Sequence, residues 1–170
     1  MKRRIAMAAC CCLFVLGRWT LPAMGQQELP GDCQAAMSIR SPQGQVDMFT
    51  RCLESGQVSG SAKATTLKQR AIAYMHLGQH QRAVDDIDEA VRIRPGDADN
   101  YYLRGVALRA LGKLDRALED TNRAIGIEPD NAGAYANRAY IYKSLGNASQ
   151  AKADAQRARE LDSSVRVPAF

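Results

Sequence analysis

Four acidic residues close together in the sequence are the first candidates for chemistry. Asp85, Asp86, Asp88 and Glu89 fall within five positions, and carboxylates in such density can bind a divalent cation. On a helix, however, Asp85 shares a face with Asp88 or Glu89, whereas Asp86 points about 100° away. The pattern favours a solvated acidic face, and we predict no metal site there.

Histidines and catalytic motifs give no better candidate for a reactive site. His76 and His80 are four residues apart, but Gly78 lies between them and interrupts the helical face that would bring them together on zinc. The sequence has no G-x-S-x-G, G-x-x-x-x-G-K-[ST], H-E-x-x-H or G-x-G-x-x-G motif. We therefore predict no catalytic residue, no metal, no cofactor and no enzymatic activity.

The first 25 residues have the three-part layout of an export signal. A positive segment up to Arg4 is followed by a mostly apolar run from Ile5 to Gly17 and by a more polar stretch that ends in small residues, Ala23 and Gly25. We predict a signal peptide over residues 1–25, cleaved before Gln26. The alternative is an uncleaved anchor, but thirteen helical residues reach only about 20 Å of the roughly 30 Å hydrocarbon core. We expect no membrane insertion after cleavage.

Cleavage changes the cysteine count from five to two. Cys10, Cys11 and Cys12 lie in the predicted signal, which leaves Cys33 and Cys52 in an oxidising compartment. Their separation fits neither a zinc site nor a redox C-x-x-C motif. We predict a disulfide that closes a loop of about 20 residues, with two buried free thiols as the alternative.

The net charge of +5 does not indicate nucleic-acid binding. Four of the 23 basic residues and none of the 18 acidic residues lie in the first 25 positions, so the rest of the chain is nearly neutral. A nearly neutral body gains little from counterion release at phosphates. We predict no nucleic-acid partner.

The elements that carry these side chains follow a period of 34 residues. Residues 64–97, 98–131 and 132–165 align without gaps, and seven positions are identical in all three rows. In the middle row, one apolar stripe runs from Tyr101 to Leu111 and a second from Leu114 to Ile127, which predicts two helices ended by Gly112 and Pro129. The identical positions are Ala64/Ala98/Ala132, Arg70/Arg104/Arg138, Leu77/Leu111/Leu145, Gly78/Gly112/Gly146, Ala83/Ala117/Ala151, Asp86/Asp120/Asp154 and Ala90/Ala124/Ala158.

Two kinds of residue recur in phase with the 34-residue period, namely small residues and an arginine–aspartate pair. Small residues at the eighth position (Gly105 in the middle row) and the twentieth (Ala117) allow two helices to approach closely, and stacked helical hairpins then build the core. The arginine and the aspartate recur in phase with these packing residues. We predict structural ion pairs between the two helices of each repeat: Arg70 with Asp86, Arg104 with Asp120 and Arg138 with Asp154.

The three rows resemble the tetratricopeptide repeat (TPR) family, and the two-cysteine lead-in resembles that of small exported bacterial TPR proteins. Large residues Tyr101 and Tyr135 stand at the fourth position, whereas Thr121 and Ser163 depart from the family pattern. The resemblance implies an all-α, right-handed solenoid of three helix-turn-helix repeats at 64–97, 98–131 and 132–165. An N-terminal cap at 26–63 would contain a helix from about Gln43 to Glu54, and a tail at 166–170 would fold back or meet another chain.

The resemblance also implies a concave groove lined by the first helix of each repeat. Lys68 matches a lysine of the carboxylate clamp in chaperone-binding TPR domains, but Ile72 and Gly133 do not match its other residues. The expected ligand is an extended peptide with an acidic or carboxylate group. Asp99 also falls on this face. The predicted groove residues are Lys68, Ile72, Met75, Tyr102, Val106, Arg109, Asn137, Tyr140 and Lys143.

The predicted function is a non-enzymatic protein-protein interaction module or scaffold, exported to a bacterial periplasm or secreted. Two alternatives stay open. The chain could be a self-assembling structural protein, a homo-oligomer joined through solenoid ends or the tail, or it could be an accessory subunit of an envelope enzyme complex. The groove side chains could also be ordinary solvated helix surface.

Overall fold

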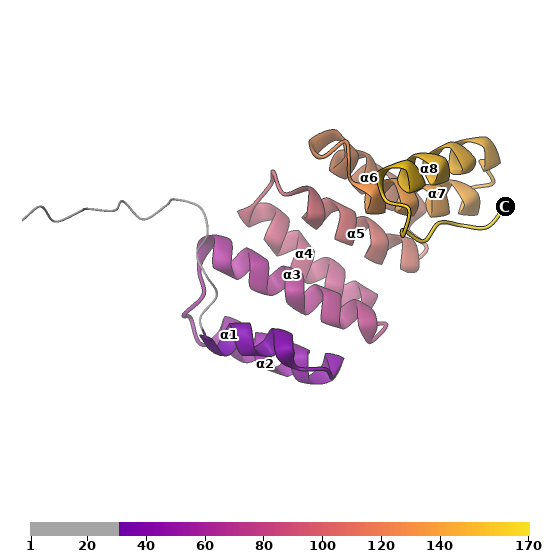
Figure 1. Ribbon diagram of the computed structural model, residues 1–170. Coiled ribbons are helices and arrows are strands. Elements are labelled where there is room, and N and C mark those ends of the chain that lie inside the picture. Colours follow the sequence, from indigo (N-terminus) through magenta and orange to yellow (C-terminus); the bar gives the residue numbers. More distant parts are fainter. Residues whose placement is uncertain (1–30) are drawn as a thin grey trace, which may run out of the picture.

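The computed structural model describes residues 31–170, and the regular elements of this part of the chain are all helices, with no strand (Figure 1). The predicted signal peptide, with Cys10, Cys11 and Cys12, lies outside the described residues. Two short helical segments and seven longer helices follow one another. They are α1 (Gly31–Ala35), η1 (Ala36–Ser38), α2 (Pro42–Glu54), α3 (Gly60–His76), α4 (His80–Ile93), α5 (Ala98–Ala110), α6 (Leu114–Ile127), α7 (Ala132–Ser144) and α8 (Ala148–Leu161).

The helices α3 to α8 form three antiparallel pairs that stack into a solenoid (Figure 1). The turn inside each pair uses a glycine with positive φ, between +70° and +79°, at Gly78, Gly112 and Gly146. A residue with a side chain would be strained in this left-handed conformation, which explains why glycine recurs every 34 residues. Helices α5 and α7 begin at the predicted repeat boundaries, whereas α3 begins four residues before residue 64.

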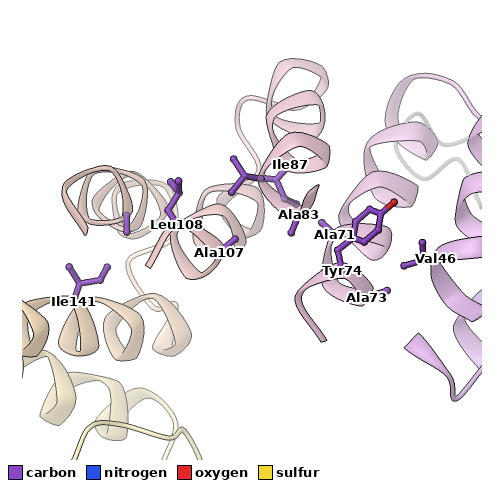
Figure 2. Packing of buried hydrophobic residues seen from close by; sticks show 11 residues of the cluster. Val46, Ala71, Ala73, Tyr74, Ala83, Ile87, Ala107, Leu108 and Ile141 are labelled. Carbon is purple, nitrogen blue, oxygen red and sulfur yellow. The ribbon is translucent and has the colours of Figure 1, made fainter. Parts of the chain in front are cut away.

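A continuous row of buried side chains crosses the stack. It runs from Val46 of α2 through Ala71 of α3 and Ile87 of α4 to Leu108 of α5 and Ile141 of α7 (Figure 2). The alanines at the eighth and twentieth repeat positions, such as Ala71 and Ala83, have no exposed surface. Each helix pair therefore buries its apolar faces partly against the next pair, as expected for a stacked array.

The N-terminal cap covers the first repeat. Helix α2 begins after Ser41, whose hydroxyl accepts a hydrogen bond from Gly44 N at 3.4 Å. The structure contains a disulfide between Cys33 of α1 and Cys52 of α2, with 5.8 Å between their Cα atoms. Both cysteines are buried beside Val58 and Ala62. The disulfide thus ties the N-terminal end of the described chain to the helix that packs on α3.

Within the described residues 31–170, no helix combines the length and the apolar character needed to cross a bilayer.

The contacts of two glycines lead to a prediction about helix packing. A Cβ added at Gly105 of α5 would lie 2.8 Å from Thr121 Oγ1 and 3.2 Å from the backbone oxygen of Ala117, both in α6. A Cβ added at Gly126 of α6 would meet nothing within 4 Å. We expect Gly105→Ala to lower the free energy of unfolding by about 1–2 kcal/mol, because overpacking outweighs the gain in helix propensity.

The Gly126→Ala variant is the matched control for this substitution. Alanine is a better helix former than glycine, and the site is open, so we expect a gain of about 0.5–1 kcal/mol. Urea denaturation of both variants measures the two effects. If both substitutions stabilise the protein equally, close approach of α5 to α6 does not limit residue size at position 105.

Candidate peptide-binding groove

The inner face of the second and third helix pairs contains a groove. Tyr102, Val106 and Arg109 line it from α5, and Asn137 and Tyr140 line it from α7. These residues lie on the first helix of their pair, which is the face that repeat position predicts. Helical spacing places them together, because residues three, four and seven apart along α5 or α7 point to one side. Gly133 and Ala136 complete the α7 wall.

A chain of hydrogen bonds fixes the floor of this groove. Arg109 Nε donates to Asn137 Oδ1 at 2.7 Å, and Asn137 Nδ2 donates to Thr121 Oγ1 at 3.0 Å. The Thr121 hydroxyl in turn donates to Ala117 O at 2.7 Å. The side chains of Asn137 and Thr121 are buried, so this hydrogen-bond network holds the Arg109 side chain in one orientation. The equivalent positions of the other two repeats hold Ile87 and Ala155, whereas here the threonine hydroxyl anchors the asparagine.

Aromatic rings flank the fixed arginine. The Arg109 guanidinium lies 5.0 Å from the centre of the Tyr140 ring, within cation–π range. Burial raises the pKa of Tyr102, so its phenol stays neutral at physiological pH. A Cβ on Gly133 would lie 3.1 Å from the Tyr102 ring, so the small residue leaves room for this tyrosine. The groove therefore offers two aromatic surfaces beside one positioned cation.

The α3 part of the predicted groove is different, because its cation is paired within the chain. Lys68 Nζ lies 3.5 Å from Asp97 Oδ2 and 3.1 Å from Asp99 Oδ2, and only 15% of the lysine side chain is exposed. Met75 packs against the core and Ile72 is half-buried. The repeat pattern placed both Lys68 and Asp99 on the inner face. Their opposite charges could therefore have predicted that the two side chains form an ion pair.

Segment 165–170 lies along the α7 part of the groove. Val165 and Arg166 border the same hollow as Tyr102 and Tyr140. Farther along, Lys143 Nζ donates to the backbone oxygen of Ala169 at 2.5 Å. The yellow segment in Figure 1 leaves α8 and passes beside α7. The chain thus folds back onto its own third repeat, which is one of the two courses expected for its tail.

The three recurrent arginines each bridge two helices of a pair. Arg104 donates to Asp120 through Nε and Nη2, both at 2.7 Å, and its Nη1 donates to Asp88 of the preceding pair, also at 2.7 Å. The hydrogen bonds that Arg104 donates to Asp120 raise the pKa of this guanidinium. In the other two repeats, Arg70 binds Asp86 and Thr50, and Arg138 binds Asp154 and Asn122. These residues join the helices that carry the groove, but they do not line the groove itself.

Family models of a repeat match three stretches of the chain. A "TPR repeat" model matches residues 105–146, and a "Tetratricopeptide repeat" model matches residues 66–97 and 132–164. Together the matched residues cover more than half of the chain. The chain belongs to the tetratricopeptide repeat family. No curated protein sequence matches the chain.

Solved TPR structures share the fold of this TPR chain. The crystal structure of MamA has a TM-score of 0.66 and 21% identity, over 77% of this chain and 74% of MamA. The TPR protein YrrB has a TM-score of 0.67 and 20% identity, over 78% of this chain and 66% of YrrB. The first TPR of Spaghetti (RPAP3), at 27% identity, has a TM-score of 0.59 over 62% of this chain and 83% of that domain.

The acidic cluster of this TPR protein is divided among separate partners. Asp86 and Asp88 bind the repeat arginines Arg70 and Arg104. Among the described residues, no group of three or more histidine, cysteine, aspartate or glutamate side chains is arranged to hold a metal ion. The remaining members are Asp85, which accepts from Gln81 Nε2 at 3.0 Å, and Glu89, which pairs with Lys63 Nζ at 2.7 Å.

Proposed function

We propose that this TPR protein is a non-enzymatic interaction module that binds a peptide or helix of a partner protein in the groove between α5 and α7. The observation that carries the proposal is the convergence of Tyr102, Val106 and Tyr140 around the anchored Arg109. Tyrosine and arginine are the side chains that most often dominate binding at protein interfaces. Because α5 and α7 are already packed, a ligand binds without first ordering its site.

Two of the structural neighbours support a peptide as the ligand class. The Spaghetti domain is described as bound to the HSP90 peptide SRMEEVD, and YrrB as a TPR protein with an unusual peptide-binding site. This chain differs from a carboxylate clamp in its residues. Lys68 is paired with Asp97 and Asp99, and positions 72 and 133 hold isoleucine and glycine. The proposed ligand is therefore not an acidic chaperone tail.

The proposed place of action is outside the cytoplasm, in a bacterial periplasm or beyond. The layout of residues 1–25 motivates this part of the proposal. The Cys33–Cys52 disulfide supports it, because stable disulfides are typical of oxidising compartments. The self-assembling scaffold is the second candidate. It is favoured by Leu145, a large exposed hydrophobic residue in the turn between α7 and α8.

Site-specific crosslinking in intact cells tests the groove. A photoreactive amino acid replaces Val106 inside the groove, and the control replaces Arg123, which is exposed on α6. We expect crosslinks to one or a few partner proteins from position 106 only, because a bound segment must contact that face. Identical products from both positions, or none from position 106, would contradict the proposed groove. Crosslinks to a second copy of the chain would favour the scaffold.

A further inference from the structure

The contacts of segment 165–170 resemble those that a bound peptide would make. Pro168 is buried and Val165 and Val167 are half-buried, whereas Arg166 between the two valines is exposed. The segment contains no helical residue. The segment therefore lies against the third repeat with Val165, Val167 and Pro168 partly or fully covered and with Arg166, Ala169 and Phe170 exposed, as in a non-helical ligand that is recognised through some of its side chains.

Two further contacts lie at the far end of this segment, where Phe170 is 55% exposed and borders α8. Lys143 Nζ donates to Ala169 O, a contact that any backbone carbonyl can accept. The Phe170 ring lies 5.7 Å from Lys143 Nζ and 5.9 Å from Lys152 Nζ, so the two ammonium groups flank the aromatic ring. Neither contact requires an acidic side chain on the ligand.

The cationic side chains of the inner face also indicate that the ligand need not be acidic. Lys68 is paired with two aspartates, and Arg109 is bonded to Asn137 and stacked on Tyr140. A carboxylate on the ligand would have to compete with these partners. Aliphatic, proline and aromatic side chains need only the apolar surface of Tyr102, Val106 and Tyr140.

We propose that the groove recognises a non-helical partner segment with aliphatic residues, a proline and an aromatic residue, and that segment 165–170 occupies its α7 half until such a partner displaces it. This inference rests on the proposed function and names its ligand class and its control. A tethered segment acts at an effective concentration near the millimolar range, so it competes with any ligand from solution even when its own contacts are weak.

A peptide of the chain's own sequence is the probe. The dye-labelled peptide Ser-Ser-Val-Arg-Val-Pro-Ala-Phe, amidated at its end, is titrated by fluorescence anisotropy into two proteins: the whole chain and a variant that ends at Ser164. We expect micromolar binding to the shortened variant and at least tenfold weaker binding to the whole chain. A peptide with serine in place of both valines and the phenylalanine should bind neither protein.

Matched substitutions in the shortened variant locate the peptide. Tyr102→Ala with Tyr140→Ala should abolish binding, and Lys143→Ala should weaken it about threefold. Lys113→Ala is the control and should leave binding unchanged, because Lys113 is exposed and bonds Gln81 away from the groove. Circular dichroism and thermal unfolding verify that each protein is folded. If the shortened variant is unfolded, the whole chain with Val165→Ser, Val167→Ser and Phe170→Ser takes its place.

Equal affinity for the whole chain and for the folded variant, or no binding to either, would overturn the inference. Light scattering on the whole chain adds a second decisive outcome. A dimer that becomes a monomer when segment 165–170 is removed would assign the segment to the groove of a second copy. If crosslinks from position 106 persist while the peptide fails to bind, the proposed function stands and this inference alone fails. If the peptide binds but position 106 gives no crosslinks, the contact of segment 165–170 with the groove stands, and the proposed binding of a partner protein fails.

Discussion

Replacing Arg104 with leucine is expected to lower the free energy of unfolding by about 3–5 kcal/mol, the usual cost of removing one partner from a buried ion pair. Asp120 is left with a carboxylate that is 10% exposed and has lost both charged hydrogen bonds. The contact with Asp88 of the preceding pair is lost as well, so adjacent repeats separate more easily. Urea denaturation of the variant and the parent protein measures the loss.

The pH dependence of this loss identifies its cause. Burial already raises the pKa of the equivalent Asp86 carboxyl, although the hydrogen bonds from Arg70 partly offset the effect. The matching Arg70→Leu variant loses those hydrogen bonds, so burial alone acts on Asp86 and its pKa should rise further above the unfolded value. A raised carboxyl pKa removes stability as the pH increases from the unfolded pKa towards the folded one. The difference between variant and parent should therefore shrink near pH 4 and be largest at pH 7.

Two controls accompany the Arg104 experiment. Arg123→Leu removes an exposed arginine of α6 in the same repeat and should change stability by about 0.5 kcal/mol or less. The double variant Arg104→Leu with Asp120→Asn removes the buried charge and should recover at least about 1 kcal/mol. If the exposed and buried arginines cost the same, the repeated pair does not hold the repeat together.

Loss of the Cys33–Cys52 disulfide has the second-largest expected effect. The cysteines are 19 residues apart in sequence, and a loop of this length corresponds to about 3 kcal/mol in the loop-entropy description. We expect Cys33→Ala with Cys52→Ala to lose about this amount. Because each repeat is stabilised by its neighbours, the cap should open before the rest of the solenoid.

Hydrogen exchange shows where this stability is lost. Amides of α1 and α2 should lose protection in the double-alanine variant, whereas those of α5 to α7 should change little. A reducing agent should act on the parent protein in the same way and should have no effect on the variant. Uniform loss of protection over all helices would mean that the disulfide stabilises the whole stack and not mainly its cap.

The repeat pattern predicted most of the solenoid, because identical residues in phase report the same contacts three times. It predicted the turns at Gly78, Gly112 and Gly146 and the small residues between the helices. It missed the first turn of α3, since Gly60 to Lys63 have no equivalent in the other two rows. A boundary chosen by alignment follows the shared positions and does not detect an extension at one end.

The groove was predicted less completely than the fold. Repeat position decides which face of a helix a residue occupies, and Tyr102, Val106 and Tyr140 line one hollow in the structure. It does not decide which charges pair across helices, and Lys68 lies within reach of Asp97 and Asp99. Segment 165–170 has too few residues to show a period, so its path along α7 depends on tertiary contacts.

The arginine bridges have a consequence for how such a chain can change in length. Each unit of 34 residues contains both the arginine and the aspartate of its own pair, and its second helix presents a polar residue such as Asp88 or Asn122 to the next arginine. Duplication of residues 98–131 would add a unit whose charges are already matched. Insertion or deletion of whole units is therefore an accessible evolutionary route to a longer or shorter groove, whereas a partial unit would leave a buried carboxylate without its arginine.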